Sequence, residues 1–359
     1  MSNHEVLSQQ QRALELAMEG KFDEALITIE QNIKKYPGNS GNYYFKGRIH
    51  DELLQYEASI AAYKKCLKRD KKNKKAKVNL GLAYLSLENF REGCSFYHFR
   101  HSDDVIRRFN KVRPWYPKCR PGKVLIWAEQ GIGDEVMFAQ LIGNLADYSH
   151  KFFLECDVRL HKILSKNYPW LGLIARNSEF DLKGFDYHLP IGDLLKFFSG
   201  KLGNIPKSTL KPLEIEAVNI STQNLNDRGF SLVGISWLSM NEEYGVRRSR
   251  PVELFCNELN PKDTAIINLQ YLTPETEIEI IRSRGFSVVD SFDCFGDLNA
   301  VFALISKCDK IITIDNSVAH FAGSIGAKTE VWLPSLPNWR WGMKRTSCYW
   351  YPNVTIKMF

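Results

Sequence analysis

Small and large apolar residues recur every 34 positions in the first third of the chain. The small positions that open each set are Ala13, Gly47 and Gly81. Three further sets keep the same period: Phe22, Tyr56 and Phe90; Ala25, Ser59 and Gly93; Ile29, Tyr63 and Tyr97. A small side chain in one helix admits a large one from its partner, and stacked helix pairs bury a shared seam. The period therefore predicts about three helix pairs over residues 6–105.

From Lys123 onward, short apolar runs alternate with longer amphipathic stretches. Such runs, bounded by polar or turn residues, are typical of strands. A first series of strands is expected at residues 123–128, 151–156, 172–175 and 187–190. After a polar interval at Ser221–Gly229, a second series is expected at residues 231–237, 265–270, 287–291, 310–315, 329–334 and 353–359. Strands that alternate with helices predict parallel sheets.

These patterns predict three domains. We expect a helical repeat domain at residues 1–112 and two Rossmann-like α/β domains at residues 121–225 and 229–359, with the Pro-rich stretch 114–123 as a linker. The two α/β domains are expected to face each other across a cleft. Ligands of such sheets bind beyond the carboxyl ends of the strands.

The composition is that of a soluble globular protein, with 44% hydrophobic and 25% charged residues in a chain of 359. The chain does not open on a basic region followed by an apolar run, and it has no apolar stretch of about 18 residues, so we expect neither a signal peptide nor a transmembrane helix. The eight cysteines are scattered without a Cys-x-x-Cys pair. They favour free thiols in a reducing cytoplasm.

The net charge of +7 is concentrated in the first third. Residues 1–120 carry 23 Lys and Arg against 14 Asp and Glu, whereas the remainder carries 25 against 27. Much of the excess lies in the run Lys64–Lys77. A solvated helix face is the expected role, because no aromatic interleaving or nucleic-acid motif accompanies the run. Nucleic-acid binding is the less favoured alternative.

The stretch VLIWAEQGIGDEVMFAQLI predicts a strand that enters a helix through a Gly-x-Gly turn. Gly131 and Gly133 allow a tight turn and close approach to a ligand. The third glycine of the dinucleotide fingerprint is replaced by Val136, and the Gly-Lys-Ser/Thr of a P-loop is absent. Asp134 follows near the helix N-terminus. It is either a helix cap or a general base at the mouth of the cleft.

A second candidate site lies at the end of the predicted strand 310–315. Asp315 ends this strand, and Asn316 and Ser317 are suited to cap the next helix. The free amides of a helix N-terminus attract anions, so a phosphate site is physically reasonable here. His320 falls in the first turn of this helix and is either a packed imidazole or a ligand contact.

A third candidate is the polar loop that follows the strand ending near Trp237. It carries Arg247, Arg248 and Ser249. Arginine is suited to bidentate phosphate contacts. A solvated basic loop is the alternative.

Near the C-terminus, aromatic and basic residues are interleaved in LPSLPNWRWGMKRTSCYWYPNV. Trp339 and Arg340 belong to this stretch. Core packing accounts for at least two of its aromatics, and stacking against a base or sugar ring is the alternative role.

Four motifs appear in order: WAEQGIGDEVMFAQ, VGISW…RRSRPVEL, IITIDNSVAHFAGSIGA and LPNWRWGMKRTSCYWYPNV. Together with the 34-residue period, which resembles the tetratricopeptide repeat, they resemble bacterial tetratricopeptide-repeat proteins with a glycosyltransferase domain of the GT-B type. These are similar to lipopolysaccharide heptosyltransferases and, more distantly, to O-linked N-acetylglucosamine transferases. The resemblance covers nearly the whole chain. It implies helical repeats followed by a GT-B pair of Rossmann-like domains.

The resemblance also implies roles for individual residues. Asp134 matches the acidic residue proposed to activate the acceptor in heptosyltransferase-like enzymes. The residues that match the diphosphate-binding strand end are Asp315, Asn316, Ser317 and His320. Arg248, and next Arg247, match the basic residue that contacts phosphate. The remaining residues expected to bind the nucleotide-sugar are Gly131, Gly133, Trp237, Ser249, Gln270, Trp339 and Arg340.

The function expected from the sequence is an inverting, metal-independent glycosyltransferase that moves a hexosyl or heptosyl group from a nucleotide-sugar to a hydroxyl of a protein or glycan. The repeats would recruit the acceptor or a protein partner. We expect no cofactor beyond the donor, no nucleic-acid partner and no integral membrane segment. Many relatives carry His-x-Asn-Asp before the Arg-Ser pair, whereas this loop reads MNEEYGVRRS. The alternative is therefore a catalytically inactive scaffold.

Overall fold

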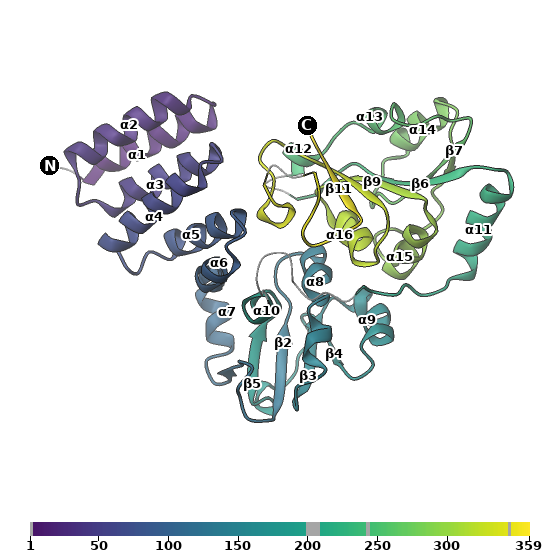
Figure 1. Cartoon of the computed structure of the whole chain (residues 1–359), viewed down its shortest axis with the longest axis horizontal. Helices are drawn as coiled ribbons and strands as arrows, with labels where there is room; N and C mark the ends of the chain where they lie inside the picture. Colours follow the sequence, from purple (N-terminus) through teal and green to yellow (C-terminus); the bar gives the residue numbers. More distant parts are fainter. Residues whose placement is uncertain (1–2, 199–208, 242–244, 344–345) are drawn as a thin grey trace. The chain divides into compact units, whose positions relative to one another are not determined.

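The computed structural model describes residues 3–198, 209–241, 245–343 and 346–359. Contacts divide the chain into two compact units (Figure 1). The first contains Met1–Arg107 together with Leu336–Met343, and the second contains Arg108–Ser335 together with Lys344–Phe359. None of the described helices is long and apolar enough to cross a bilayer.

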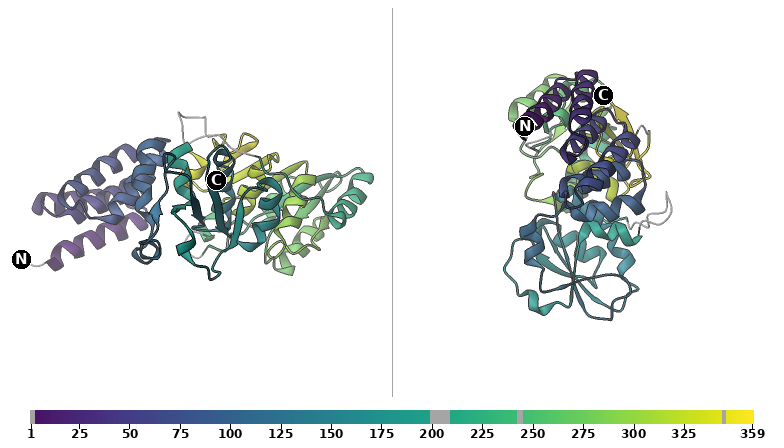
Figure 2. Two further views of the ribbon diagram at one scale, coloured as in Figure 1. Left: turned by 90° about the horizontal axis from the view of Figure 1, so that it is seen from below. Right: turned by 90° about the vertical axis from the view of Figure 1, so that its left-hand side faces the viewer.

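The first unit is built from pairs of helices that lie side by side (Figures 1 and 2). The pairs are α1 (Asn3–Met18) with α2 (Phe22–Lys35), α3 (Ser40–Glu52) with α4 (Tyr56–Arg69), and α5 (Lys74–Ser86) with α6 (Phe90–Tyr97). A short α7 (Asp103–Arg108) follows. The second helix of each pair begins at a large apolar residue of the 34-residue period. The three predicted helix pairs are therefore confirmed.

Small residues of the period lie where the helices touch. A Cβ on Gly47 would come within 2.5 Å of the Tyr63 ring, so the ring occupies the space that a side chain on α3 would need. Tyr63 and Ile29 are fully buried in the cores of their pairs. The period thus records a packing requirement between paired helices.

The second unit contains two sheets, each of parallel strands. The first has the order β1-β5-β2-β3-β4. Its strands are β1 (Arg113–Pro114), β2 (Lys123–Trp127), β3 (Lys151–Cys156), β4 (Gly172–Ala175) and β5 (Tyr187–Pro190). Its α-helices are α8 (Ile132–Ala139), α9 (His161–Asn167) and α10 (Leu194–Phe198).

The second sheet has the order β11-β10-β9-β6-β7-β8. Its strands are β6 (Ser231–Ser236), β7 (Thr264–Asn268), β8 (Ser287–Val289), β9 (Lys310–Ile314), β10 (Thr329–Leu333) and β11 (Val354–Met358). Its helices are α11 (Glu216–Asp227), α12 (Gly245–Arg248), α13 (Val252–Cys256), α14 (Glu275–Ser283), α15 (Leu298–Lys307) and α16 (Ser317–Ser324). The helices cover both faces of the sheet (Figure 1).

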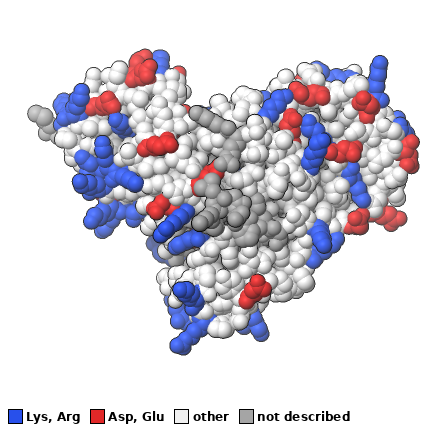
Figure 3. All heavy atoms as spheres, in the orientation of Figure 1, with Lys and Arg blue, Asp and Glu red and all other residues white. Residues whose placement is uncertain are grey.

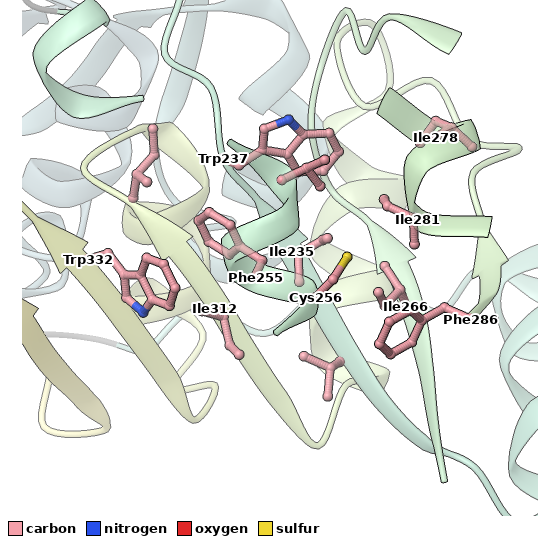
Figure 4. Packing of buried hydrophobic residues seen from close by; sticks show 13 residues of the cluster. Ile235, Trp237, Phe255, Cys256, Ile266, Ile278, Ile281, Phe286, Ile312 and Trp332 are labelled. Carbon is pink, nitrogen blue, oxygen red and sulfur yellow. The ribbon is translucent and has the colours of Figure 1, made fainter. Parts of the chain in front are cut away.

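The core on one face of the second sheet is aromatic and aliphatic. Phe255 of α13 stacks on Trp332 of β10 with ring centroids 4.4 Å apart, and Ile278 and Ile281 of α14 complete the layer with Trp237 (Figure 4). The predicted order of folds, helical repeats followed by two Rossmann-like sheets, is confirmed.

Three segments differ from the ranges expected from the sequence. Most of the polar interval 221–229 belongs to α11, which packs on α15 and β6, so the second half begins before residue 229. The predicted linker 114–123 overlaps β1, which pairs with β5. Residues 336–343, expected in the last domain, group with the repeats.

Candidate functional site

The N-terminus of α16 lies at the carboxyl edge of the second sheet. Asn316 caps the helix, because its side-chain oxygen accepts a hydrogen bond of 3.0 Å from the Val318 amide. Its Nδ2 donates to the Ser236 hydroxyl at 2.8 Å and to the Leu238 carbonyl at 3.3 Å. Asn316 is thus a buried connector between the ends of β9 and β6 rather than an exposed ligand contact.

Arg248 is brought to the same edge by α12. Its Nε lies 3.2 Å from Oδ2 of Asp315, a carboxylate that is 5% exposed. Arg247 is exposed. The Ser249 hydroxyl donates to the Gly245 carbonyl at 2.8 Å and accepts from the Ser239 amide at 2.9 Å, so its role is to fold the loop. A cation beside a helix N-terminus favours an anionic ligand.

Asp134 lies in the first turn of α8, and this turn packs against α16. A Cβ on Gly133 would stand 2.9 Å from Cδ2 of His320 and 3.2 Å from Cα of Ser317. Gly133 is therefore required for the contact between the two helices. His320 is buried, and its Nδ1 lies 2.9 Å from the Tyr351 hydroxyl.

The structure thus brings together two predicted groups from opposite halves of the second unit. The turn with Gly133 and Asp134 comes from the first half. The strand end and the first residues of α16 come from the second half, with Arg248 beside them. The separation in sequence between these groups is large, so only the fold brings them together.

Two predicted binding residues hold the scaffold instead. The ring of Trp237 is fully buried, and its Nε1 donates to Glu277 Oε2 at 2.8 Å. Gln270 is 2% exposed, and its Oε1 accepts from the amides of Trp237 and Leu238 at 3.0 and 2.8 Å. The bonds of Gln270 tie the ends of β6 and β7 together, and the bond of Trp237 reaches α14. The side chains of Trp237 and Gln270 are therefore not placed to contact a nucleotide.

Trp339 and Arg340 lie in the segment 336–343, which groups with the repeats. The Trp339 ring packs edge-on against Tyr97, with centroids 5.7 Å apart. Arg340 donates through Nη1 to the Asn338 side chain at 2.7 Å. The core-packing alternative for this stretch therefore describes Trp339, and the stacking role predicted for it is corrected.

Sequence reasoning missed a buried ion pair beside Asp134. Glu135 is 1% exposed, and its Oε1 accepts from Arg176 Nη1 at 2.7 Å. Burial raises the pKa of Glu135, against the lowering effects of the Asp157 amide and Arg176. An acidic residue after Asp134 and an arginine directly after strand 172–175 were the only sequence signals.

Exposed apolar side chains line the carboxyl edge beyond β7 and β8. Leu272 is 63% exposed and has a left-handed backbone with φ of 52°, and Phe295 is 50% exposed. The Tyr271 ring lies 6.4 Å from that of Phe295. Strained residues of this kind concentrate at ligand-binding positions.

Outside this edge, two other kinds of site come into question, a metal site and a basic surface. Among the described residues, no group of three or more His, Cys, Asp or Glu is arranged to hold a metal ion. The basic run occupies the end of α4, the following turn and the start of α5, and most of its Lys and Arg side chains are exposed. Figure 3 shows Lys and Arg side chains gathered on the first unit.

Comparisons with known proteins agree with the repeat architecture. A family model described as a tetratricopeptide repeat matches residues 40–73. Helices α3 and α4 form a tetratricopeptide repeat. Protein FlbA of Caulobacter vibrioides (strain ATCC 19089 / CIP 103742 / CB 15) is 25% identical over 361 residues, covering 92% of this chain and 60% of FlbA. The chain therefore spans about 60% of the length of this curated relative.

Two solved structures match part of this chain. The glycosyl transferase family 9 structure from Veillonella parvula DSM 2008 has a TM-score of 0.46 and 11% identity, covering 66% of this chain and 86% of that chain. The second TPR of Spaghetti (RPAP3), bound to an HSP90 peptide, has a TM-score of 0.25 and 18% identity, covering 26% of this chain and 87% of that chain.

Proposed function

We propose that this protein is a GT-B-type glycosyltransferase that moves a sugar from a nucleotide-sugar to a hydroxyl acceptor. The observation that carries the proposal is the contact between the first turns of α8 and α16. Gly133, the neighbour of Asp134 in sequence, meets Ser317 and His320 of α16, and Arg248 pairs with Asp315 just before that helix. The motif resemblance to heptosyltransferases supports the same roles.

The donor diphosphate is assigned to the N-terminus of α16. Backbone amides there favour a phosphate, and the Arg248 guanidinium supplies charge-assisted donors, with part of its charge offset by Asp315. Asp315 holds Arg248 at this edge through the 3.2 Å ion pair. As the sugar leaves, these groups stabilise the charge that develops on the diphosphate.

Asp134 is assigned as the general base. Its carboxylate removes the proton from the acceptor hydroxyl while the acceptor oxygen attacks the anomeric carbon from the face opposite the diphosphate. The bond from the anomeric carbon to the phosphate oxygen breaks, and its electron pair leaves with the nucleoside diphosphate. This in-line displacement inverts the anomeric centre. The step needs no redox partner.

The nucleoside end of the donor is assigned to the apolar edge beyond β7. Neighbouring strands are about 4.8 Å apart, so the end of β7, two strands from β9, lies roughly 10 Å from Asp315. The ribose alone is shorter than this distance, which is spanned by the ribose together with the phosphates. Leu272 and the Tyr271–Phe295 ring pair offer the apolar and aromatic surface that a base requires.

A nucleotide panel tests the donor site. Thermal unfolding is measured with UDP, GDP, ADP, CMP and their sugar conjugates, because a ligand that binds only the native state raises the melting temperature. We expect one nucleotide to raise it clearly. Arg248→Gln should lower the affinity for that nucleotide about tenfold or more, since a charge-assisted hydrogen bond is lost. The exposed neighbour gives the matched control, Arg247→Gln, which should change affinity much less.

Asp134→Asn separates binding from chemistry. We expect the variant to keep the nucleotide shift and to lose about 10²–10⁴-fold in release of the nucleoside diphosphate from the bound nucleotide-sugar. Full activity in this variant would refute the base assignment. Both assays use the whole chain.

An inactive scaffold is the second candidate, because the loop lacks the histidine found in many relatives. Part of that loop, residues 242–244, lies outside the described residues. Binding of a nucleotide without release, over a broad acceptor panel, would favour this candidate. A panel without any shift would assign the working surface to the tetratricopeptide repeats and their protein partners.

A further inference from the structure

The ion pair between the buried Glu135 and the half-buried Arg176 has no part in the proposed transfer step. Both carboxylate oxygens of Glu135 are bound within the first half, Oε1 by Arg176 Nη1 at 2.7 Å and Oε2 by the Asp157 amide at 2.8 Å. The Arg176 side chain is 33% exposed and that of Glu135 is 2% exposed. The pair therefore anchors α8 to the ends of β3 and β4.

The same guanidinium nitrogen also holds the turn before α8. Arg176 Nη1 donates to the Gln130 carbonyl at 3.0 Å. Gln130 has φ of 61°, a left-handed conformation that a residue with a side chain adopts at an energetic cost. Such a conformation persists only where surrounding contacts impose it. One arginine thus ties the strained turn to the helix that carries Asp134.

We propose that Arg176 and Glu135 are positioning residues that hold the turn at residues 130–134 in the conformation that presents Asp134 to the acceptor. The inference rests on the proposed function. A displacement of about 1 Å in a reacting group costs about 10²-fold in rate. A turn that relaxes toward an ordinary backbone conformation would move the base by a distance of that order.

The network continues from Glu135 to the other half of the unit. Asp157 accepts two hydrogen bonds of 2.7 and 2.9 Å from the Arg159 guanidinium, and Arg159 Nη1 donates to the Phe295 carbonyl at 2.8 Å. Phe295 lies at the edge assigned to the nucleoside. The network therefore connects the turn to the half to which the donor is assigned.

Arg176→Lys is the test variant. It keeps the positive charge, but an ammonium group does not reproduce the planar fork that serves a carbonyl and a carboxylate together. Arg108→Lys is the matched control, because Arg108 pairs with the buried Glu155 of the same sheet at 2.9 Å. Glu135→Gln is a second test variant, which keeps an acceptor for the Asp157 amide.

Two measurements are made on the whole chain. The first is amide hydrogen exchange of residues 130–135, which needs no activity. The second is steady-state release of nucleoside diphosphate, with water as acceptor, from the nucleotide-sugar that gives the largest thermal shift. We expect Arg176→Lys to speed exchange in this segment about tenfold and to lower kcat about 10²-fold, with KM for the donor nearly unchanged. Arg108→Lys should do neither.

The outcomes separate this inference from the proposed function. Unchanged exchange in both Arg176→Lys and Glu135→Gln would overturn the positioning role, whatever the activity. Faster exchange with an unchanged kcat would also overturn it, and so would equal effects in Arg108→Lys. If the wild-type chain neither binds a nucleotide nor releases nucleoside diphosphate from a nucleotide-sugar, the proposed function is overturned. The role of the turn in catalysis is then overturned as well.

Discussion

A missing side chain at Gly133 allows the two halves of the second unit to meet at the candidate site. The position of its absent Cβ lies 2.9 Å from His320 and 3.2 Å from the Ser317 backbone, where real Cβ atoms do not fit without movement. Gly131 differs, because a Cβ there would meet nothing within 4 Å and its backbone is extended, with φ of −96°. The two glycines of one turn therefore have different physical roles.

This difference predicts opposite tolerances to alanine. Gly133→Ala should lower the free energy of unfolding by about 1–3 kcal/mol, because the new methyl group overpacks a contact with backbone. Gly131→Ala should stay within about 0.5 kcal/mol of wild type. Urea unfolding followed by tryptophan fluorescence measures both. Equal losses in the two variants would contradict the packing role of Gly133.

Residue types predicted part of the candidate site and misled for the rest. The polar triplet Asp315, Asn316 and Ser317 after an apolar strand correctly predicted the strand end and the helix cap, and its role in donor binding stays a prediction. Trp237 was misjudged because β6 has both faces buried. Its apolar run therefore carries no alternation that would show which way the next side chain points. Arg176 was missed because its partner is 41 residues away in sequence.

At the scale of elements, strands were predictable where an apolar run was unbroken. All ten expected strands are present within the described residues. β1 was missed because its two residues are exposed and carry no apolar run. α11 was missed because its buried face, Val218, Thr222 and Leu225, is narrow and mixed, so a window starting at Ser221 appears polar.

The capping residue of α16 makes more hydrogen bonds than an ordinary helix cap, because it also binds residues at the end of β6. Asn316→Ala should cost about 2–4 kcal/mol of unfolding free energy, since it loses the cap and leaves buried partners at Ser236 and Leu238 unsatisfied. Asp297→Ala is the control in the same unit. Asp297 caps α15 through the amides of Asn299 and Ala300 but is exposed, so its loss should cost about 1 kcal/mol.

Urea unfolding of the two cap variants decides between these roles. A loss at Asn316 no larger than that at Asp297 would show that the bonds between β9 and β6 add nothing. A larger loss with an unchanged nucleotide shift would show that the cap supports the sheet edge without contacting the donor. The comparison therefore tests whether Asn316 supports the sheet edge or binds the donor.

At the scale of the whole molecule, a segment from the C-terminal part of the sequence belongs to the N-terminal unit. The segment 336–343 leaves β10 and joins the repeats before the chain returns to β11. Its short helix at Trp339–Trp341 packs against α5, and the two tryptophans are 4% and 0% exposed. Domain ranges predicted from the sequence do not reveal such a segment, because they assign every segment to the same domain as its neighbours in sequence.

The position of segment 336–343 predicts that the α/β unit, when expressed without the repeats, is not a well-behaved monomer. A fragment of residues 108–359 would lose the surface that buries Trp339 and Trp341, and each tryptophan buries about 150–250 Å². Exposed apolar patches of that size promote association. We expect this fragment to elute as aggregates in size-exclusion chromatography, whereas the same fragment with Trp339→Ser and Trp341→Ser should elute mainly as a monomer. In the full chain the same double substitution should instead lower the stability of the repeats. A monomeric unmodified fragment that keeps the nucleotide shift of the whole chain would mean that the repeats are an independent attachment rather than part of the support of the α/β unit.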